Sequence, residues 1–188
     1  MLFRSDLSDE SLESLEQRTF DSLEKSVNYR MVADVPVGAF LSGGVDSSAV
    51  VALMSQRTDY PIKTYSIGFQ DQPDYDELAY ARSVSKQFKT DHYEKTVSAL
   101  EICDFVPRIV DIFDEPLADS TCIPIYFLSQ KAREMGTKVV LTGDGSDEIF
   151  AGYRSYYRYL RNYPLFHAYA KLPSLLKKMV ASSYRLID

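Results

Sequence analysis

The chain has 188 residues, of which 45% are hydrophobic and 26% charged, with a formal net charge of −6. These values are typical of a soluble globular protein with its own core. The acidic balance argues against a broad nucleic-acid footprint, and no apolar run approaches the ~20 residues that span a bilayer. We therefore expect that the protein binds neither nucleic acid nor a membrane. Two cysteines without a metal-binding spacing, and an N-terminus without a signal-peptide core, favour a cytoplasmic protein.

Helical and strand patterns alternate along the chain. Residues 1–33 are expected to form a leading segment whose residues 9–33 are an amphipathic helix. Residues 34–188 are expected to form the α/β domain that follows it. Strands are predicted at residues 36–41, 62–69, 91–97 and 138–142. Helices are predicted within residues 42–57, 76–88, 98–113 with a kink at Pro107, and 124–135. This alternation predicts an α/β fold in which helices cover both faces of a parallel sheet and ligands bind at the carboxyl ends of strands.

A glycine-rich turn, SGGVDSS at residues 42–48, lies between the first strand and the helical run that follows it. Helix N-termini carry unpaired N–H groups and partial positive charge, which attract phosphate. Gly43 and Gly44 can take a positive φ and let the backbone approach an anion, while the serines add hydroxyl donors. Asp46 suits such a site if Mg²⁺ lies between its carboxylate and the phosphate. The alternative is an ordinary strand-to-helix turn with a capping Asp or Ser.

A second glycine-rich turn, at residues 143–148, follows the fourth predicted strand. It places three carboxylates, those of Asp144, Asp147 and Glu148, within five residues. Such carboxylates repel one another, which favours either solvent exposure or a shared cation. A solvated loop in which Asp147 caps the next helix is the alternative. If the first and fourth strands are neighbours, the two turns face each other across one crevice.

The first turn lacks the lysine of a Walker A motif and resembles the SGGxDSS loop of the ATP pyrophosphatase, or PP-loop, superfamily. SGGVDSS and TGDGSDEIFAGY (142–153) together resemble the synthetase domain of glutamine-hydrolysing asparagine synthetases. Similar segments occur in the same order in that family: TYSIGF (64–69), YDELAYAR (75–82), DEPLADST (114–121) and PIYFLSQKAREMG (124–136). The resemblance covers roughly residues 30–160 and implies the strand order 3-2-1-4.

What the resemblance implies is a two-step ligation. The aspartate β-carboxylate attacks the α-phosphorus of ATP and releases pyrophosphate; ammonia then converts the β-aspartyl-AMP to asparagine and AMP. The residues implied to hold pyrophosphate are Ser42, Gly43, Gly44, Asp46, Ser47 and Ser48, with Mg²⁺ on Asp46 and Asp147. Those implied to line the adenosine site are Leu41, Ile67, Gly68, Thr142 and Gly143. Asp144, which matches an acidic position that supports the acyl-adenylate, and Tyr153, which matches a tyrosine beside the crevice, are the candidate catalytic residues.

The sequence also departs from the family pattern. Leu2 stands where these enzymes carry the cysteine nucleophile of an N-terminal glutaminase domain. We therefore expect a truncated chain whose full protein includes a glutaminase domain or subunit and more of the synthetase domain; a homodimer is among the expected assemblies. Two other readings stay open: a β-lactam synthetase-like adenylating enzyme, and an ATP-binding module without activity.

Overall fold

The computed structural model describes residues 10–70, 77–114, 119–174 and 176–177. The chain divides into two compact units, one up to Gly143 and the other from Asp144 onward. The first unit contains the sheet and the helices that cover it, and the described part of the second contains helices α7 (Ser146–Phe150) and α8 (Arg154–Lys171). The predicted domain boundary between residues 33 and 34 stays a prediction.

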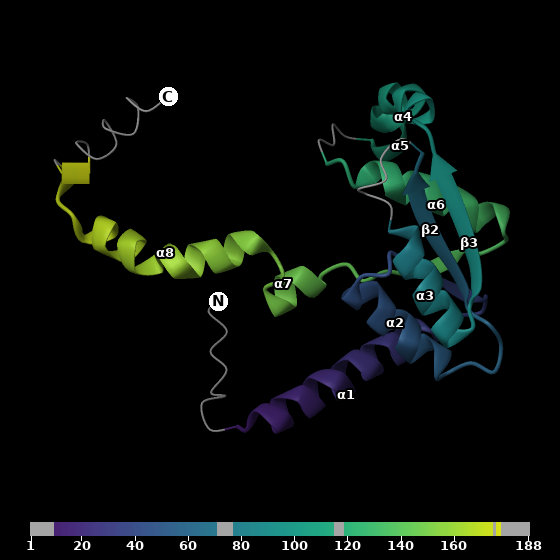
Figure 1. Cartoon of the computed structure of the whole chain (residues 1–188), viewed down its shortest axis with the longest axis horizontal. Helices are drawn as coiled ribbons and strands as arrows, with labels where there is room; N and C mark the ends of the chain where they lie inside the picture. The colour runs from purple at the N-terminus through teal and green to yellow at the C-terminus, as the bar shows by residue number, and fades with distance from the viewer. Residues whose placement is uncertain (1–9, 71–76, 115–118, 175, 178–188) are drawn as a thin grey trace. The chain divides into compact units, whose positions relative to one another are not determined.

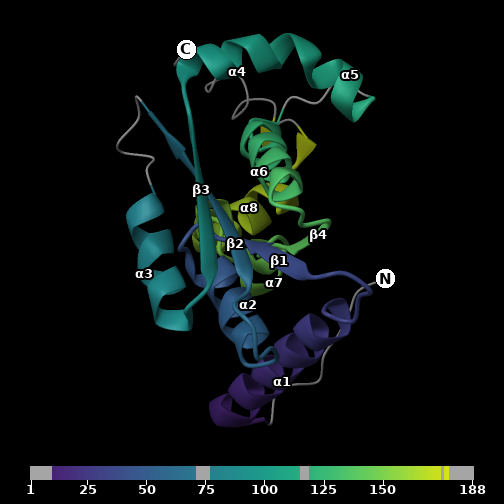
Figure 2. The same ribbon diagram turned by 90° about the vertical axis from the view of Figure 1, so that its right-hand side faces the viewer.

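The first unit is built on a four-stranded parallel sheet. Its strands are β1 (Val37–Phe40), β2 (Lys63–Phe69), β3 (Asp91–Val97) and β4 (Val139–Leu141). They run side by side in the order β3-β2-β1-β4, which confirms the predicted order (Figure 2). From β1 the chain proceeds outward through β2 and β3 and then returns to the other side of β1. The switch point of the sheet therefore lies between β1 and β4, where ligands bind in open α/β sheets.

Three helices cover one face of the sheet: α1 (Leu12–Arg30), α2 (Val45–Ser55) and α3 (Leu78–Phe88). Val37 and Ala39 of β1, with Leu41 directly after the strand, occupy alternate positions and pack with these helices in one buried cluster. Helix α1 joins the cluster near its C-terminal end, where Val27 is buried, whereas Leu12 at its start is exposed. Figure 1 shows the C-terminal end of α1 beside α2. The apolar stripe predicted for the leading helix thus packs over its C-terminal half.

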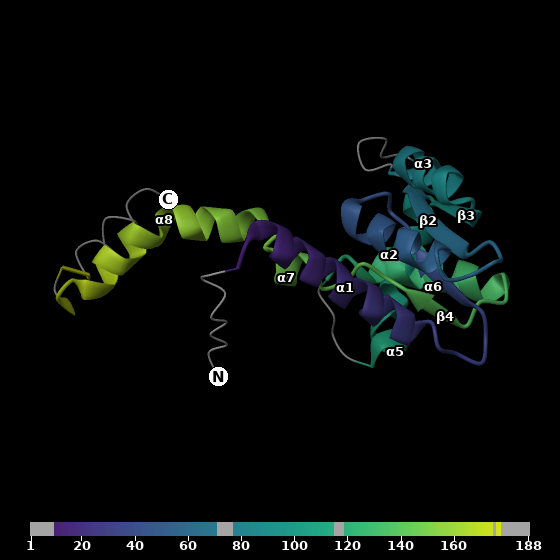
Figure 3. The ribbon, with the colours of Figure 1, turned by 90° about the horizontal axis from the view of Figure 1, so that it is seen from below.

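The opposite face carries α4 (Ala99–Phe105), α5 (Ile109–Phe113) and α6 (Cys122–Glu134). The helix predicted over residues 98–113 is broken by a 3₁₀ turn, Val106–Arg108, that contains Pro107, because proline has no N–H to continue the helix. Tyr65 of β2 packs with Leu128 and Ala132 of α6. In Figure 3, α3 and α5 lie on opposite sides of the strands. Helices on both faces of the sheet were predicted, and the arrangement confirms it.

The second unit contains α7 (Ser146–Phe150) and α8 (Arg154–Lys171). Aromatic rings of α8 contact one another along the helix, as in the stacked pair of Tyr159 and Phe166 with ring centroids 5.6 Å apart. Among the residues that the structure describes, no helix combines the length and the apolar character that a membrane crossing requires.

Candidate functional site at the carboxyl ends of the central strands

The loop after β1 is shaped by one glycine. Gly43 has a φ of +87°, a left-handed conformation that residues with a Cβ adopt at a cost. A Cβ on Gly43 would stand 2.5 Å from the Cβ of Tyr80 and 2.6 Å from the backbone nitrogen of Ala81, both in α3. Gly44, by contrast, has φ −67° and ψ 164°, an ordinary extended conformation at the residue before α2. Gly43 therefore lets the loop lie directly against the first turn of α3.

The serine hydroxyls close this loop on itself. Ser47, which is buried, places its Oγ 3.3 Å from the carbonyl oxygen of Gly44, to which it donates, and 3.0 Å from the Oγ of Ser42. The Ser47 hydroxyl has one hydrogen, so Ser42 is the donor between the two hydroxyls. Ser47 Oγ also accepts from the Ser42 N–H at 3.3 Å, and Ser42 Oγ accepts from the Gly44 N–H at 3.1 Å. The two hydroxyls expected to face a ligand thus first fix the shape of the loop.

Helix α2 starts where the loop ends. Its first turn directs the N–H groups of Val45, Asp46 and Ser47 out of the helix end without intrahelical acceptors, at the positive end of the helix dipole. The Ser48 N–H bonds the Gly44 carbonyl at 3.1 Å, while its buried Oγ has no hydrogen-bond partner within the described residues. An orphaned hydroxyl beside N–H groups that have no acceptor within the helix has the chemistry of an anion cradle.

The end of β4 reaches the same loop. Ala39 of β1 pairs with Leu141 of β4, so Thr142 and Gly143 leave the sheet beside the residues that follow β1. A Cβ on Gly143 would lie 2.8 Å from the Ser47 nitrogen and 3.0 Å from the Asp46 Cβ. Glycine is therefore required at 143 by close packing. The structure brings the end of β4 against the loop, as expected for neighbouring first and fourth strands.

The remaining residues predicted for the adenosine site lie partly within the core. Leu41 is 1% exposed and packs in the cluster beneath α1 and α2. Ile67 of β2 is half-buried and packs on the opposite face, against the clusters that contain Tyr65 and Val97. Gly68 is buried beside it. The role of these residues, and of Thr142 and Gly143, in binding adenosine stays a prediction.

The second unit contains the other predicted site residues, Asp144, Asp147 and Tyr153. The Tyr153 hydroxyl donates to the carboxylate of Glu148 at 2.6 Å. This hydrogen bond is the main cause that raises the pKa of Tyr153 to about 12, and it lowers the pKa of Glu148. The Gly152 N–H donates to the Asp147 carbonyl at 3.0 Å and closes the turn after α7. Sequence reasoning placed Tyr153 near the site but missed its pairing with Glu148.

The predicted Mg²⁺ site rests on Asp46 and Asp147. A half-buried carboxylate in the first turn of α2, beside N–H groups suited to phosphate, matches the oxygen ligands that Mg²⁺ prefers. Mg²⁺ commonly binds through one or two carboxylates and substrate phosphates, and across the described ranges no three His, Cys, Asp or Glu residues gather as a metal site. Asp46 and Asp147 belong to different units, so their pairing stays a prediction.

Sequence reasoning missed two contributions to the loop. Tyr80 and Ala81 form the wall against which Gly43 packs. Ser66 of β2 is 2% exposed, and its hydroxyl donates to the carbonyl of Leu41 at the start of the loop. A signal for Ser66 was present, because a polar residue at an inward-facing strand position needs a hydrogen-bond partner. Of the segments that carry the family resemblance, residues 75–76 and 115–118 lie outside the described residues.

The sequence of the chain matches one family of known proteins. The family model for asparagine synthase matches residues 19–187. The chain is 39% identical over 160 residues to asparagine synthetase [glutamine-hydrolyzing] 1 of Bacillus subtilis, covering 85% of this chain and 24% of that protein. It is 43% identical over 150 residues to putative asparagine synthetase [glutamine-hydrolyzing] 2 of Methanocaldococcus jannaschii, covering 77% and 28%.

Among solved structures, an NH3-dependent NAD synthetase from Campylobacter jejuni aligns with a TM-score of 0.46 at 15% identity, over 77% of this chain and 61% of that one. The chain spans about a quarter of the length of the two curated relatives above. The family model nevertheless covers most of the present sequence, including both glycine-containing turns and all four strands. The chain belongs to the asparagine synthase family.

Proposed function

We propose that this chain carries the ATP-cleaving site of an asparagine synthetase, which forms asparagine from aspartate with release of pyrophosphate and AMP. The observation that carries the proposal is the loop after β1, in which Gly43 lies against α3 and the N-terminus of α2 opens toward the carboxyl edge of the sheet. Membership of the asparagine synthase family and the names of the curated relatives support the same reaction.

In the first step an oxygen of the aspartate β-carboxylate attacks the α-phosphorus of ATP. The bond from that phosphorus to the bridging oxygen breaks, and its electron pair leaves with pyrophosphate. The N–H groups at the start of α2, with the hydroxyl of Ser48, stabilise the charge that develops on this leaving group. Asp46 and Asp147 are the residues that we assign to Mg²⁺, which would neutralise part of the same charge.

In the second step ammonia attacks the β-carbonyl carbon of β-aspartyl-AMP, the bond to AMP breaks, and the nitrogen loses a proton. We assign Asp144 to orient the ammonia. The Tyr153 phenol donates its hydrogen to Glu148, which raises its pKa to about 12, so at neutral pH it is protonated and does not act as a base. In the whole protein a glutaminase domain or subunit supplies the ammonia.

The test is release of pyrophosphate from Mg·ATP by the purified chain, supplied with ammonium, with and without aspartate. Aspartate-dependent release with formation of asparagine supports the proposal. Release that requires a different carboxylate points to another adenylating enzyme of the same superfamily. Binding of Mg·ATP without release means that these residues form an ATP-binding module. Absence of Mg·ATP binding overturns the proposal.

A further inference from the structure

Strand β2 presents polar side chains to the helices on one of its faces. Thr64 and Ser66 are separated by one residue, so both point to the α3 side of the sheet, and they are 0% and 2% exposed. Between them, Tyr65 points to the α6 side. A buried hydroxyl without a hydrogen-bond partner is destabilising, so each of these two hydroxyls needs a partner within the fold.

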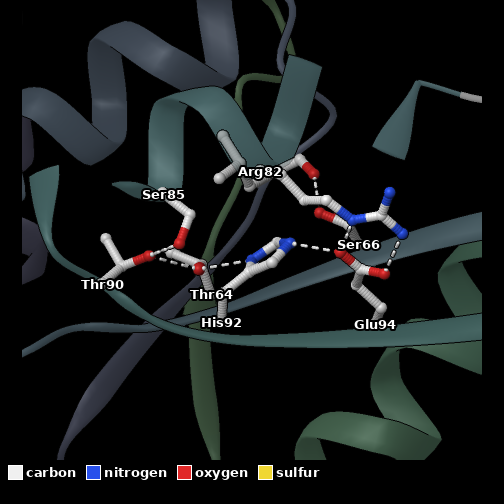
Figure 4. A network of polar contacts seen from close by, with 8 residues as sticks. Thr64, Ser66, Arg82, Ser85, Thr90, His92 and Glu94 are labelled. Atoms are coloured by element: carbon white, nitrogen blue, oxygen red, sulfur yellow. Dashed lines mark hydrogen bonds and ion pairs between the residues drawn. The ribbon is translucent and has the colours of Figure 1, made fainter. Parts of the chain in front are cut away.

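Thr64 belongs to a network that joins β2, β3 and α3 (Figure 4). Its Oγ1 lies 2.8 Å from Thr90 Oγ1 and 2.9 Å from His92 Nδ1, and Thr90 donates to Ser85 of α3 at 2.9 Å. Because Thr90 donates its single hydroxyl hydrogen to Ser85, Thr64 must be the donor to Thr90. The Thr64 hydroxyl therefore accepts from His92, whose Nδ1–H is the donor. On the far side of the ring, Glu94 accepts two hydrogen bonds from Arg82.

Ser66, two residues further along the same face, contacts instead Leu41, which leads into the loop after β1, residues 42–48. Its hydroxyl donates to the carbonyl oxygen of Leu41. The N–H of Leu41 donates to the carbonyl of Tyr65 at 2.9 Å, as part of the pairing between β1 and β2. Both backbone groups of Leu41 are therefore tied to β2, the N–H by the main chain and the carbonyl by a side chain.

The Leu41 carbonyl shares one rigid peptide plane with the N–H of Ser42, and in a trans peptide the two point in opposite directions. Ser66 holds one end of this plane, and Ser47 Oγ accepts from the N–H at the other end at 3.3 Å. Ser47 is also the hydroxyl that binds Ser42 Oγ and the Gly44 carbonyl. The orientation of this one plane thus sets where the whole hydroxyl network of the loop stands.

We propose that Ser66 is a positioning residue for nucleotide binding: it fixes the Leu41–Ser42 peptide plane and so holds the loop in its binding shape before ATP arrives. The expected effect on ATP affinity rests on the proposed function. Its structural content, the hold on the loop, stands independently of any ligand. Ser66 touches no reacting group in this arrangement, because it acts through the backbone of Leu41.

The test compares Ser66→Ala with Thr64→Val, a matched control that removes a buried hydroxyl from the same face of the same strand. Amide hydrogen exchange is measured on the nucleotide-free proteins, and Mg·ATP affinity by calorimetry. We expect Ser66→Ala to speed exchange of the Ser42 amide and weaken Mg·ATP binding, each about tenfold. Thr64→Val should keep both within about twofold of wild type at a similar loss of stability.

Ser66→Cys, with its weaker donor, should fall between wild type and Ser66→Ala, and it serves if the alanine variant does not fold. Unchanged Ser42 exchange in the Ser66 variants, or an equal effect of Thr64→Val, overturns the positioning role. If wild type fails to bind Mg·ATP while Ser42 exchange still responds to Ser66→Ala, the proposed function fails and the hold on the loop stands.

Discussion

The two glycine-containing turns, after β1 and after β4, differ in what holds them. At the first, the left-handed Gly43 is packed against the backbone of α3, and Ser42 and Ser47 bond each other. At the second, Gly145 is also left-handed, with a φ of +90°, but a Cβ placed on it would meet nothing within 4 Å. One glycine is required by its neighbours as well as by its φ, and the other by its φ alone.

The helices that follow the turns show the same difference. Helix α2 has 11 residues and buries Val50, Val51, Leu53 and Met54, so its N-terminus is anchored by the core. Helix α7 has five residues between left-handed Gly145 and left-handed Ala151. Tertiary packing thus preorganises the first turn, whereas the second turn is packed at Gly143 and is shaped beyond it by local backbone geometry. A preorganised donor set is what stabilises developing charge without reorganisation, which suits the first turn to pyrophosphate.

Alanine in place of Gly43 or Gly145 should give the largest difference between the two turns. Gly43→Ala forces a Cβ into α3 and a strained φ, and we expect it to lower the free energy of unfolding by roughly 3 kcal/mol and to abolish Mg·ATP binding. Gly145→Ala meets only the φ penalty, about 1 kcal/mol. Urea denaturation of both variants measures the difference, and equal losses would contradict the contrast between the turns.

The carboxylate of the first turn is the next target. We expect Asp46→Asn to weaken Mg·ATP binding on the order of 10–100-fold while leaving unfolding nearly unchanged, because an amide is a poorer ligand for Mg²⁺. Asp59→Asn, at an exposed position beyond the end of α2, is the matched control and should bind like wild type. Calorimetric titration with Mg·ATP decides; full affinity in Asp46→Asn would remove the metal role from this residue.

The polar network around His92, next to the first turn's Ser66 contact on the same face of β2, should lose stability in acid. Burial lowers the pKa of His92 from 6.5, against the opposing effect of Glu94 and with a smaller contribution from Arg82. Native protein therefore binds fewer protons than unfolded chain below that value, and stability falls as the pH drops below about 6.5. The pKa of Glu94 is itself lowered, so its own loss comes at more acid pH. Urea midpoints at pH 7 and 5.5 should differ less in His92→Asn, and an equal decline in both would contradict this origin.

The smallest expected effect is confined to the second unit. In Glu148→Gln the phenol of Tyr153 loses its carboxylate acceptor, and its pKa should fall from about 12 toward 10.0. NMR titration of labelled tyrosine follows the ring directly, and stability should change little because both side chains are exposed. A pKa that stays near 12 in the variant would mean that another group holds the phenol proton.

Sequence patterns were sufficient for what depends on local periodicity. The four strands, their helices, the break at Pro107 and the helix end before left-handed Gly136 all follow from the spacing of apolar residues and from proline and glycine. Strand order came from the family resemblance, because periodicity does not determine which strands are neighbours. The resemblance also selected the two turns as candidate sites.

Hydrogen-bond partners could not be read from the sequence, since they depend on which side chains the fold brings together. Ser42 and Ser47 were predicted as ligand donors, but the structure engages their hydroxyls within the loop. Ser66 lies 25 residues after the carbonyl that it holds, and no pattern links the two positions. Pairing of this kind is set by the register of β1 against β2, in which Phe40 meets Tyr65.

The pairing of β1 with β4 has a consequence for the order in which the protein is made. Val37 pairs with Val139, about 100 residues later in the chain, and Gly143 closes against Ser47 only after that pairing. Contacts so distant in sequence form late, because a large loop must be closed before they form. A nascent chain therefore carries the loop at residues 42–48 without its Gly143 contact throughout the synthesis of β2, β3 and α6. Gly143 reaches Ser47 only once β4 has paired with β1, so the proposed nucleotide site is completed together with the fold of the first unit.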